Sequence, residues 1–253
     1  MAPTIIVPSR SISVRQFEKR LNRLSGKHRK LLTDHLGEPP DPKNIPKAIW
    51  RQIEEENAAL LILLVAAAAI NTLRPELFRL ERAAGEKIET EDVLKELSRN
   101  ANARAKQVAK WTTGTTRKRI TDLFNKDGAP TTTAGVRDVL NQSRTRTIAE
   151  NESIAAETVA RETVRKTAEK KGLAVVQVWR LGPCNHCKVC PMVDRTPDSF
   201  WRRFSSGPPL HPHCCCSLET YYELEDSLRD RGIIRMSNPS QEMVLSAIRD
   251  SRF

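Results

Sequence analysis

The amino-acid sequence predicts a mainly α-helical protein whose C-terminal part is a small α+β module held together by zinc. Ala, Leu, Glu, Lys and Arg are abundant, 29% of the residues are charged and only 5% are aromatic, a composition typical of long helices. Toward the C-terminus the apolar residues change to the alternating period of a strand. All six cysteines follow that strand, between Cys184 and Cys216, in a pattern typical of a metal site.

Proline-rich and polar breaks divide the chain into four predicted segments. Residues 1–43 contain an irregular arm and a first helix. Residues 44–146 form a helical region that carries the most apolar and the most basic stretches of the chain. Residues 147–220 form the module that contains the cysteines, and residues 221–253 form a C-terminal tail.

A proline-rich break separates the first two helices. Ser11 or Ser13 can cap a first helix that runs to about His35, because a serine hydroxyl accepts a hydrogen bond from the first turn. The segment EPPDPKNIP cannot continue this helix, since proline lacks the N–H group. A second long helix is expected to begin near Asn44–Pro46, where proline is tolerated in the first turn.

The most apolar stretch, Ala58–Ile70, lies in this second helix and is apolar on all sides. Its 13 residues are fewer than the ~20 that span a bilayer, and three glutamates precede it. We therefore favour a core helix or a subunit interface over stable membrane insertion. Pro75 and Gly85 are expected to interrupt the chain after it.

A third long helix is expected to begin at Thr90, with acidic residues in its first turn, and to run to about Trp111. The sequence TTGTT at 112–116 predicts a break. A short amphipathic helix from Arg117 and another at Val136–Leu140 are expected to follow.

Thr147 and Glu150 have the spacing of a capping box, which predicts the start of an alanine-rich helix. This helix is expected to end at Lys171, because Gly172 is a typical residue just past a helix end. The next seven residues, Leu173–Trp179, alternate as a strand does. A closing strand at 217–226 and a terminal helix from Ser240 complete the prediction.

The net charge of +11 predicts a polyanionic partner, and nucleic acid is the partner that we expect. Residues 101–150 carry ten Lys and Arg against four Asp and Glu, whereas residues 217–253 carry five against seven. No aromatic residue alternates with these cations in a way that would suggest base stacking, so contact with phosphates is expected. A solvated helix face is the alternative. The candidate nucleic-acid-binding residues are Arg104, Lys110, Arg117, Lys118 and Arg119.

The cysteines and histidines have the spacing of a zinc ribbon or knuckle. Two overlapping C-x-x-C pairs at 184–190 are followed, after twenty intervening residues, by His211, His213 and three consecutive cysteines. Zn²⁺ takes four such ligands, two from a tight knuckle and two from a distant pair. Disulfides or redox chemistry are the alternatives. The N-terminus does not resemble a signal peptide, which favours a cytosolic chain with reduced thiols.

The choice of four ligands stays open. Cys187 and Cys190 make the best knuckle, because a proline follows and tightens the turn. His211 and Cys214 make the best second pair, although Cys216 could replace His211 in a C-x-C chelate. The remaining two, Cys184 and Cys215, are expected to be spare.

The order of these elements resembles the phage head morphogenesis family, the minor head or minor capsid proteins related to protein F of phage Mu. The family typically shows an I-A-x-x-E helix, a short strand ending in Trp, C-x-x-C followed by L-D-G, and P-P-L-H-P-N-C-R-C. The matching residues here are Ile148, Ala149, Glu152, Trp179, Cys187, Cys190, Asp194, Pro208, Pro209, Leu210, His211, Pro212, Cys214 and Cys216. The resemblance covers about residues 145–218.

Four positions depart from the family pattern. Arg195 replaces the glycine, which suggests a different turn after the knuckle, and His213 and Cys215 replace the asparagine and the arginine. Cys184 is additional, so the extra cysteines widen the choice of ligands.

The resemblance implies a low-copy, non-enzymatic structural protein of a tailed phage, with no catalytic residues. It would stand in the virion head near the portal vertex, and in the host cytoplasm during assembly. It would act in head morphogenesis and in DNA packaging or delivery. The implied partners are the portal protein, the major capsid protein or both, and packaged DNA bound without sequence preference.

Two other classes of function fit the sequence less well. A zinc deaminase would need His-x-Glu before the cysteines, and neither His28 nor His35 is followed by Glu two residues later. A zinc-containing DNA-binding protein fits the basic residues, although no recognition helix is evident. An HNH-like nuclease would need a catalytic histidine, for which His186 or His213 would have to serve.

Overall fold

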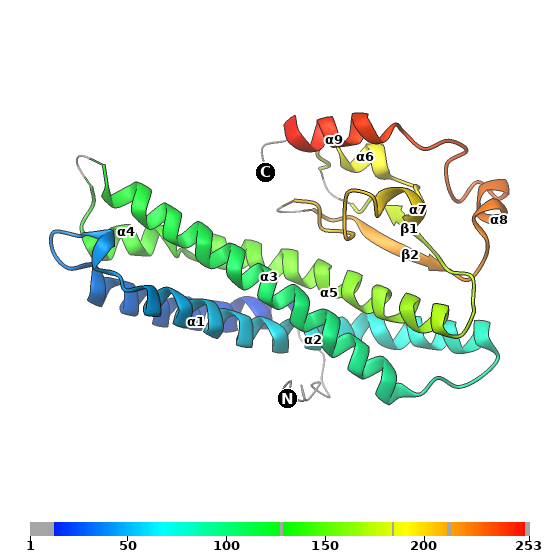
Figure 1. Ribbon diagram of the computed structural model, residues 1–253, viewed down its shortest axis with the longest axis horizontal. Helices are drawn as coiled ribbons and strands as arrows, with labels where there is room; N and C mark the ends of the chain where they lie inside the picture. Colours follow the sequence, from blue (N-terminus) through cyan, green and yellow to red (C-terminus); the bar gives the residue numbers. More distant parts are fainter. Residues whose placement is uncertain (1–12, 127–128, 184, 212–213, 251–253) are drawn as a thin grey trace. The chain divides into compact units, whose positions relative to one another are not determined.

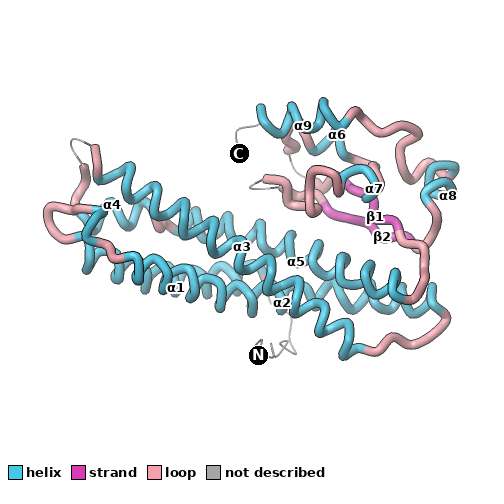
Figure 2. The backbone as a smooth tube through the Cα atoms, in the orientation of Figure 1, coloured by secondary structure: helices cyan, strands magenta, loops and turns pink. Residues whose placement is uncertain are grey.

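The computed structural model describes residues 13–126, 129–183, 185–211 and 214–250. The chain is mainly helical, with long helices followed by a two-stranded sheet in its C-terminal part, as the sequence predicts (Figures 1 and 2). A cysteine–histidine cluster that could hold a metal lies beside that sheet.

The chain folds into two compact units. The helical unit comprises Met1–Ala67 and Ser98–Ala149, and the mixed unit comprises Ala68–Leu97 and Glu150–Phe253. Three long helices contribute one part to each unit. They are α2 (Lys47–Ala84), α3 (Thr90–Phe124) and α5 (Gln142–Lys170).

Helix α1 (Val14–Leu36) begins at Ser13, one of the two predicted caps. Ser13 Oγ accepts from Gln16 N at 3.3 Å, and the Gln16 side chain accepts from Ser13 N at 3.0 Å, which completes a capping box. Ser11, the other predicted cap, lies outside the described residues. The buried side chains of α1 form one stripe: Phe17, Leu21, Ser25, His28, Leu32 and Leu36.

One core of the helical unit joins α1, α2, α3 and the short helix α4 (Thr132–Val139), which confirms the helix predicted near residue 136. A 3-10 turn, η1 (Pro42–Asn44), crosses the proline-rich break between α1 and α2. The buried members of this core are Leu32, Leu36, Ile45, Trp50, Ile53, Ile120, Phe124, Val136 and Val139.

Helix α2 passes through Pro75, so the interruption predicted there is wrong. Proline removes one hydrogen bond to the carbonyl four residues earlier, that of Asn71, and Asn71 is exposed to water, which can replace the missing donor. The helix ends at Ala84, and Gly85 follows with a φ of 70°, as predicted for a helix stop.

By length and composition, α2 is the one described helix that could span a membrane. Within its most apolar stretch, Leu61 and residues 64–70 are buried inside the protein, whereas Leu63 is 44% exposed. Burial of most of this stretch agrees with a core helix.

Helix α3 runs without interruption to Phe124, so the break predicted at 112–116 is wrong. The threonine hydroxyls bond inside the helix instead of opening it. Thr112 Oγ1 donates to Val108 O at 2.8 Å, and Thr116 Oγ1 donates to Thr112 O at 2.7 Å. Both threonines are buried, so tertiary packing overrides their weak helix propensity.

Helix α5 begins at Gln142, five residues before the predicted start at Thr147. Asn141 is the cap, because its Oδ1 accepts from Arg144 N at 2.9 Å. Thr147 lies inside the helix and donates to Ser143 O at 3.1 Å, so its spacing to Glu150 does not mark a helix start.

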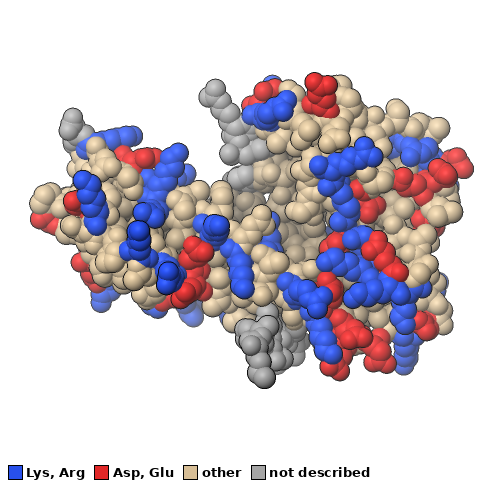
Figure 3. Space-filling view, viewed as in Figure 1, with Lys and Arg blue, Asp and Glu red and all other residues tan. Residues whose placement is uncertain are grey.

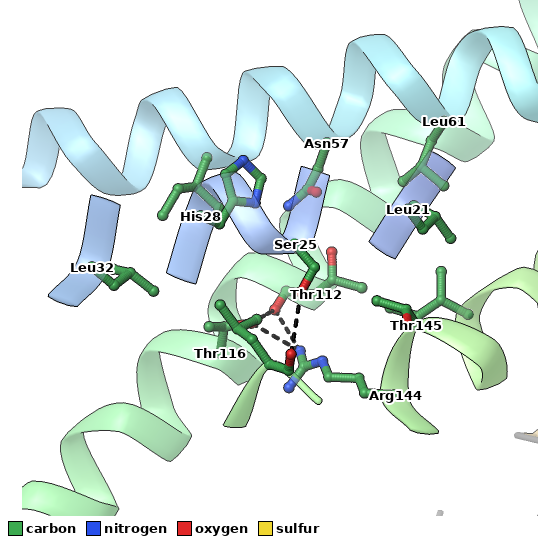
Figure 4. A pocket seen from close by; sticks show the side chains of 13 residues that line it. Leu21, Ser25, His28, Leu32, Asn57, Leu61, Thr112, Thr116, Arg144 and Thr145 are labelled. Carbon is green, nitrogen blue, oxygen red and sulfur yellow. Dashed lines mark hydrogen bonds between the residues drawn. The ribbon is translucent and has the colours of Figure 1, made fainter. Parts of the chain in front are cut away.

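Arg144 links the first turns of α5 to the threonines of α3 (Figure 4). Its Nη2 donates to Thr112 O at 2.9 Å, to Thr115 Oγ1 at 2.8 Å and to Thr116 Oγ1 at 2.9 Å. Burial, with a smaller contribution from the charge of Arg119, lowers the pKa of Arg144 to about 10.

A cavity of about 40 Å³ lies beside this contact in the helical unit. Its polar hydroxyl groups already donate to protein oxygens. Ser25 Oγ donates to Leu140 O at 3.3 Å, and Thr145 Oγ1 donates to Gln142 O at 2.8 Å. The hydroxyl groups that line the cavity therefore have hydrogen-bond acceptors within the protein, and the cavity has room for a few waters at most.

The sheet of the mixed unit is an antiparallel pair of β1 (Val176–Arg180) and β2 (Ser217–Tyr221), in which Val176 pairs with Tyr221 and Arg180 with Ser217. This confirms the two strands that the alternating residues predict. The short helices around the sheet are α6 (Cys190–Val193), α7 (Asp198–Trp201), α8 (Glu225–Asp230) and α9 (Gln241–Asp250). Helix α9 begins after Ser240, as predicted, and Ser240 Oγ accepts from Met243 N at 3.2 Å.

Candidate metal centre

The pairing of β1 with β2 brings the two halves of the cysteine motif to the same end of the sheet. Arg180, the last residue of β1, pairs with Ser217, the first residue of β2. The chain that leaves β1 therefore starts beside Cys216, which immediately precedes β2. Sequence neighbours of a paired position stay close in space, so the knuckle and the distant cysteines meet here.

Gly182 permits this approach. A Cβ atom at this position would lie 1.9 Å from the carbonyl oxygen of Cys215, a distance that no side chain could occupy. The two backbones that carry the cysteines can come this close only because residue 182 is glycine.

The predicted knuckle is formed. Cys187 Sγ and Cys190 Sγ are 3.4 Å apart, and Cys190 N donates to Cys187 Sγ at 3.4 Å. Cys190 begins α6 and Pro191 occupies the first turn, where a missing N–H does no harm. Two sulfur ligands of a tetrahedral Zn²⁺, each about 2.3 Å from the ion, would lie about 3.8 Å apart, so the observed spacing suits a shared metal.

Histidines reach Cys190 from two directions. Cys190 Sγ lies 3.4 Å from His211 Nε2, and the donor atoms of Cys187, Cys190 and His211 all lie within 4.8 Å of one another. The donors of His186, Cys190 and Cys216 form a second group within the same limit. His186 was not predicted as a ligand, although its place inside the C-N-H-C knuckle was a signal for it.

The thiols of Cys190, Cys214 and Cys216 interact so closely that charge is unevenly shared among them. The contact with Cys190 is the main cause that lowers the pKa of Cys214, to about 2, while contact with Cys214 raises the pKa of Cys190 far above its usual range. The pKa of Cys216 rises to about 11, since its contact with Cys190, which lowers it, is outweighed by Cys214 and burial. A divalent cation would relieve this competition, because it stabilises several thiolates at once.

A buried indole lies beside Cys216. Trp179 is fully buried, and its Nε1 has no hydrogen-bond partner among the described residues. The same indole lies near enough to Cys216 to act toward lowering the pKa of that thiol. A metal-bound thiolate at Cys216 would be the acceptor that this orphaned N–H lacks.

The centre is enclosed by an apolar shell. The rings of Trp179 and Trp201 meet edge to face with centroids 5.7 Å apart, and Trp201 Nε1 donates to Gln177 O at 3.2 Å. The other buried members of this core are Val189, Cys190, Val193, Phe200, Cys214, Cys216, Leu218 and Val244. Such a shell limits access of water to the sulfurs.

The loop that carries His211 is fixed to α5. Thr158 Oγ1 donates to Pro208 O at 2.6 Å. Gly207 has a φ of 107°, and a Cβ atom there would lie 2.7 Å from the methyl group of Thr158. Both the conformation and the close contact require glycine at this position.

The turn after the knuckle places Arg195 in a backbone conformation that is rare for residues other than glycine. Arg195 has a φ of 58°, the left-handed conformation that glycine favours. Its guanidinium donates to Gly232 O, and its backbone N donates to Trp179 O at 2.8 Å. These contacts hold the strained residue in place. Asp194, which matches the family pattern, accepts from Leu181 N at 3.1 Å and so fixes the chain that leaves β1.

Of the predicted ligands, Cys187, Cys190 and His211 form one group and Cys216 belongs to the other, while Cys214 interacts with Cys190 and Cys216. Cys215 is disulfide-bonded, so the expectation of reduced thiols is wrong for this residue. The thiols of Cys187, Cys190, Cys214 and Cys216 are free. Cys184 and His213 lie outside the described residues.

The predicted nucleic-acid-binding residues all belong to the helical unit, on α3. Lys110, Arg117, Lys118 and Arg119 are exposed, and Arg104 is half-buried. The helical unit carries 22 Lys and Arg against 10 Asp and Glu, whereas the mixed unit carries 20 against 21. In the mixed unit basic side chains pair with acidic ones, as in the Arg202–Glu162 ion pair. Figure 3 shows Lys and Arg next to Asp and Glu on one face of the molecule. The positive charge of the protein therefore resides in the helical unit.

Comparisons with protein-family models, with curated proteins and with solved structures gave no match to this chain.

Proposed function

We propose that the chain is a minor head protein of a tailed phage, a structural component whose C-terminal module is held together by one Zn²⁺. The observation that carries the proposal is the convergence at Cys190 of two motif halves that lie 21 residues apart in sequence. The order and spacing of these residues resemble those of the phage head morphogenesis motif. A structural zinc site needs this kind of arrangement, with two remote pieces of chain joined at one ion.

Zinc is the metal that the donors suit best. The cluster offers thiolates and imidazoles and stands in an apolar shell, a donor set typical of structural Zn²⁺. Cys187 and Cys190 supply the knuckle, and two more ligands come from His211, Cys214 and Cys216. When bound, the ion would neutralise the clustered thiolates and stabilise the fold of the module.

Metal analysis with paired variants tests the zinc site. Protein purified under reducing conditions without chelator should contain about one zinc per chain, and Cys190→Ser should lose it, because both donor groups share Cys190. His211→Ala and His186→Ala form a matched pair: loss of zinc only in the first assigns the knuckle and His211. Substoichiometric zinc in the wild type, with all free thiols reactive, would contradict the proposal.

The proposed role is in head morphogenesis and in packaging or delivery of DNA, close to the portal vertex. The portal protein or the major capsid protein would be the protein partner. Leu63 of α2, which is 44% exposed within the most apolar stretch, would be one apolar contact for such a partner. The cations of the helical unit would contact packaged DNA through its phosphates.

Quantitative mass spectrometry of particles tests this role. Purified virions should contain the chain at up to about a dozen copies, as expected for a closed ring at one vertex. Deletion of the coding region should leave capsid shells forming while infectious yield falls. Absence of the chain from both procapsids and mature particles would refute the assignment.

The distribution of charge favours a second candidate, a zinc-containing DNA-binding protein outside the virion. The excess of 12 positive charges in the helical unit would serve such a protein equally well. Specific binding to one DNA sequence would support this candidate. Cleavage of DNA by the purified chain would instead support an HNH-like nuclease.

A further inference from the structure

One solvent-exposed face of α3, which we call the ridge, has only basic residues among its charged side chains and one large aromatic side chain at its centre. The exposed residues recur at helical spacing: Lys106, Gln107, Lys110, Trp111, Gly114, Arg117 and Lys118. Between Ser98 and Thr121 the helix carries seven Lys and Arg and no Asp or Glu. A solvated helix face usually alternates charges of both signs, so this ridge is unusual.

Trp111 is the exposed tryptophan among four. It is 61% exposed, whereas Trp50, Trp179 and Trp201 are at most 7% exposed. On the sequence alone Trp111 lies at the end of a helix, where it does not suggest base stacking. In the continuous α3 it lies in mid-helix, with Lys106 and Lys110 before it and Arg117 and Lys118 after it.

The surroundings leave one face of the indole open. Gly114 lies one turn further along the ridge, and a Cβ atom placed on it would have no neighbour within 4 Å. The four ridge cations, Lys106, Lys110, Arg117 and Lys118, form no ion pair or hydrogen bond among the residues that the structure describes. Both the ring and the charges are therefore available to a ligand.

We propose that this ridge binds single-stranded nucleic acid, with an unpaired base stacked on Trp111 and phosphates on the cations to either side. An indole offers a flat apolar face that any base can stack on, and flanking cations neutralise the backbone. Lys110 and Arg117 are separated by about 10 Å along the axis at 1.5 Å per residue, which leaves room for a base between them. A membrane surface would need a continuous apolar face, which a single tryptophan does not provide.

This inference rests on the proposed contact between the helical unit and nucleic acid, and it adds the class of ligand. Phosphate contact alone would serve duplex DNA and single strands alike. Stacking on Trp111 requires an unpaired base, so the ridge should favour a single strand, such as the frayed or displaced end of a duplex.

Tryptophan fluorescence of the full chain provides the assay. Because the other three tryptophans are buried, collisional quenching by acrylamide should report mainly Trp111. Oligo-dT should quench the same emission and protect it from acrylamide, and a mixed-sequence duplex should do so much less. Oligo-rU serves as a second arm, and equal binding would extend the ligand class to RNA.

Variants separate stacking from charge. Trp111→Ala lacks the reporting indole, so its affinity is measured by filter binding. The substitution should weaken oligo-dT binding about 5- to 150-fold and leave duplex affinity unchanged, since one stacked base contributes roughly 1–3 kcal/mol. Trp111→Phe should recover most of the loss. Lys106→Gln with Lys110→Gln should reduce the salt dependence of both ligands. Phe78→Ala, which removes a 60%-exposed aromatic side chain from the mixed unit, is the matched control. It should change neither the affinity for oligo-dT nor the salt dependence of binding.

The outcomes distinguish the two levels of inference. Equal affinity of Trp111→Ala and the wild type for oligo-dT would overturn the stacking site. Salt-dependent binding of duplex DNA in the same experiment would still support the proposed contact between the helical unit and phosphates. Failure of the wild type to bind any nucleic acid would overturn both. If Trp111→Ala instead abolishes self-association in sedimentation and leaves oligo-dT binding intact, the ridge is a protein interface and the inference is wrong.

Discussion

Glu56 on α2 is the electrostatic link between the first two helices, and its removal tests how the helical unit is held together. Glu56 Oε1 lies 2.7 Å from Lys27 Nζ, and its Oε2 lies 3.1 Å from Nε2 of the buried His28. Gln52 Nε2 also donates to Oε1 at 2.9 Å. The carboxylate thus joins α1 to α2 through charged and neutral donors.

These donors lower the pKa of Glu56 to about 2, even though desolvation on its own would raise it. From the ordinary value of 4.5, such a shift corresponds to roughly 3 kcal/mol of stabilisation of the folded state. The Lys27 side chain is 59% exposed, so solvent screening reduces its contribution. We expect Glu56→Gln to lower the free energy of unfolding by about 1–2 kcal/mol at pH 7.

The effect of pH has a definite sign. Because the folded-state pKa of Glu56 is lowered, its contribution is complete above pH 4.5 and disappears as the pH falls toward 2. The difference between wild type and Glu56→Gln should therefore shrink over that range. Urea unfolding followed by circular dichroism measures it, and the melting temperature at pH 7 should fall by about 2–8 °C.

The neighbouring Glu55 is a matched control. It is exposed, it has the same charge at nearly the same place on α2, and its side chain makes no ion pair among the described residues. Glu55→Gln should change stability by less than about 0.5 kcal/mol. Equal losses for the two variants, or a Glu56→Gln difference that stays constant down to pH 2, would refute this reasoning.

Three further predictions follow from single contacts. Gly182→Ala should abolish zinc retention, because the alanine Cβ would lie 1.9 Å from the carbonyl oxygen of Cys215. Normal zinc content in this variant would show that the two backbones do not come so close. Replacing the three cations at 117–119 with Glu should make the plot of log affinity for DNA against log salt concentration less steep, by about 3. Titrations at several salt concentrations measure this slope. An unchanged slope would show that these cations only face solvent. Leu61→Asp should give insoluble or unfolded protein, because Leu61 is only 2% exposed. Leu63→Asp, at a 44%-exposed position, should stay soluble. Wild-type protein that stays with membranes after carbonate extraction would contradict both expectations.

Local sequence signals predicted the mainly helical fold, the strand pair and a cysteine–histidine cluster that could hold a metal. Ser13 with Gln16, Gly85 and the alternating residues of β1 each act through neighbours in the sequence. These signals hold because the atoms that satisfy them lie within a few residues. The knuckle was predictable for the same reason, since C-x-x-C is a local chelate.

The errors arose where distant residues decide the structure. The threonines at 112–116 suggest a break in isolation, yet Arg144, about thirty residues later, donates to them and they stay in the helix. Likewise Thr147 has cap spacing, but Asn141 already caps the helix earlier. Propensity is a weak prior that tertiary contacts override. The meeting of the two halves of the cysteine motif is likewise set by a distant contact, the pairing of Arg180 with Ser217.

The excess of cations and the candidate metal site belong to different units, and this leads to a last prediction. It distinguishes a structural head protein from a zinc-dependent DNA-binding protein. In a zinc-dependent DNA-binding module the metal organises the element that contacts DNA, so metal loss abolishes binding. Here the donors belong to the mixed unit, which carries 20 Lys and Arg against 21 Asp and Glu, and the cations of α3 belong to the helical unit. Cys190→Ser should therefore lose zinc and the fold of the C-terminal module while it keeps the affinity for nucleic acid and its salt slope. Filter binding across a salt series, with metal content measured on the same samples, tests this. Parallel loss of zinc and of binding would show that the metal organises the nucleic-acid site, which would favour the DNA-binding protein over the structural head protein.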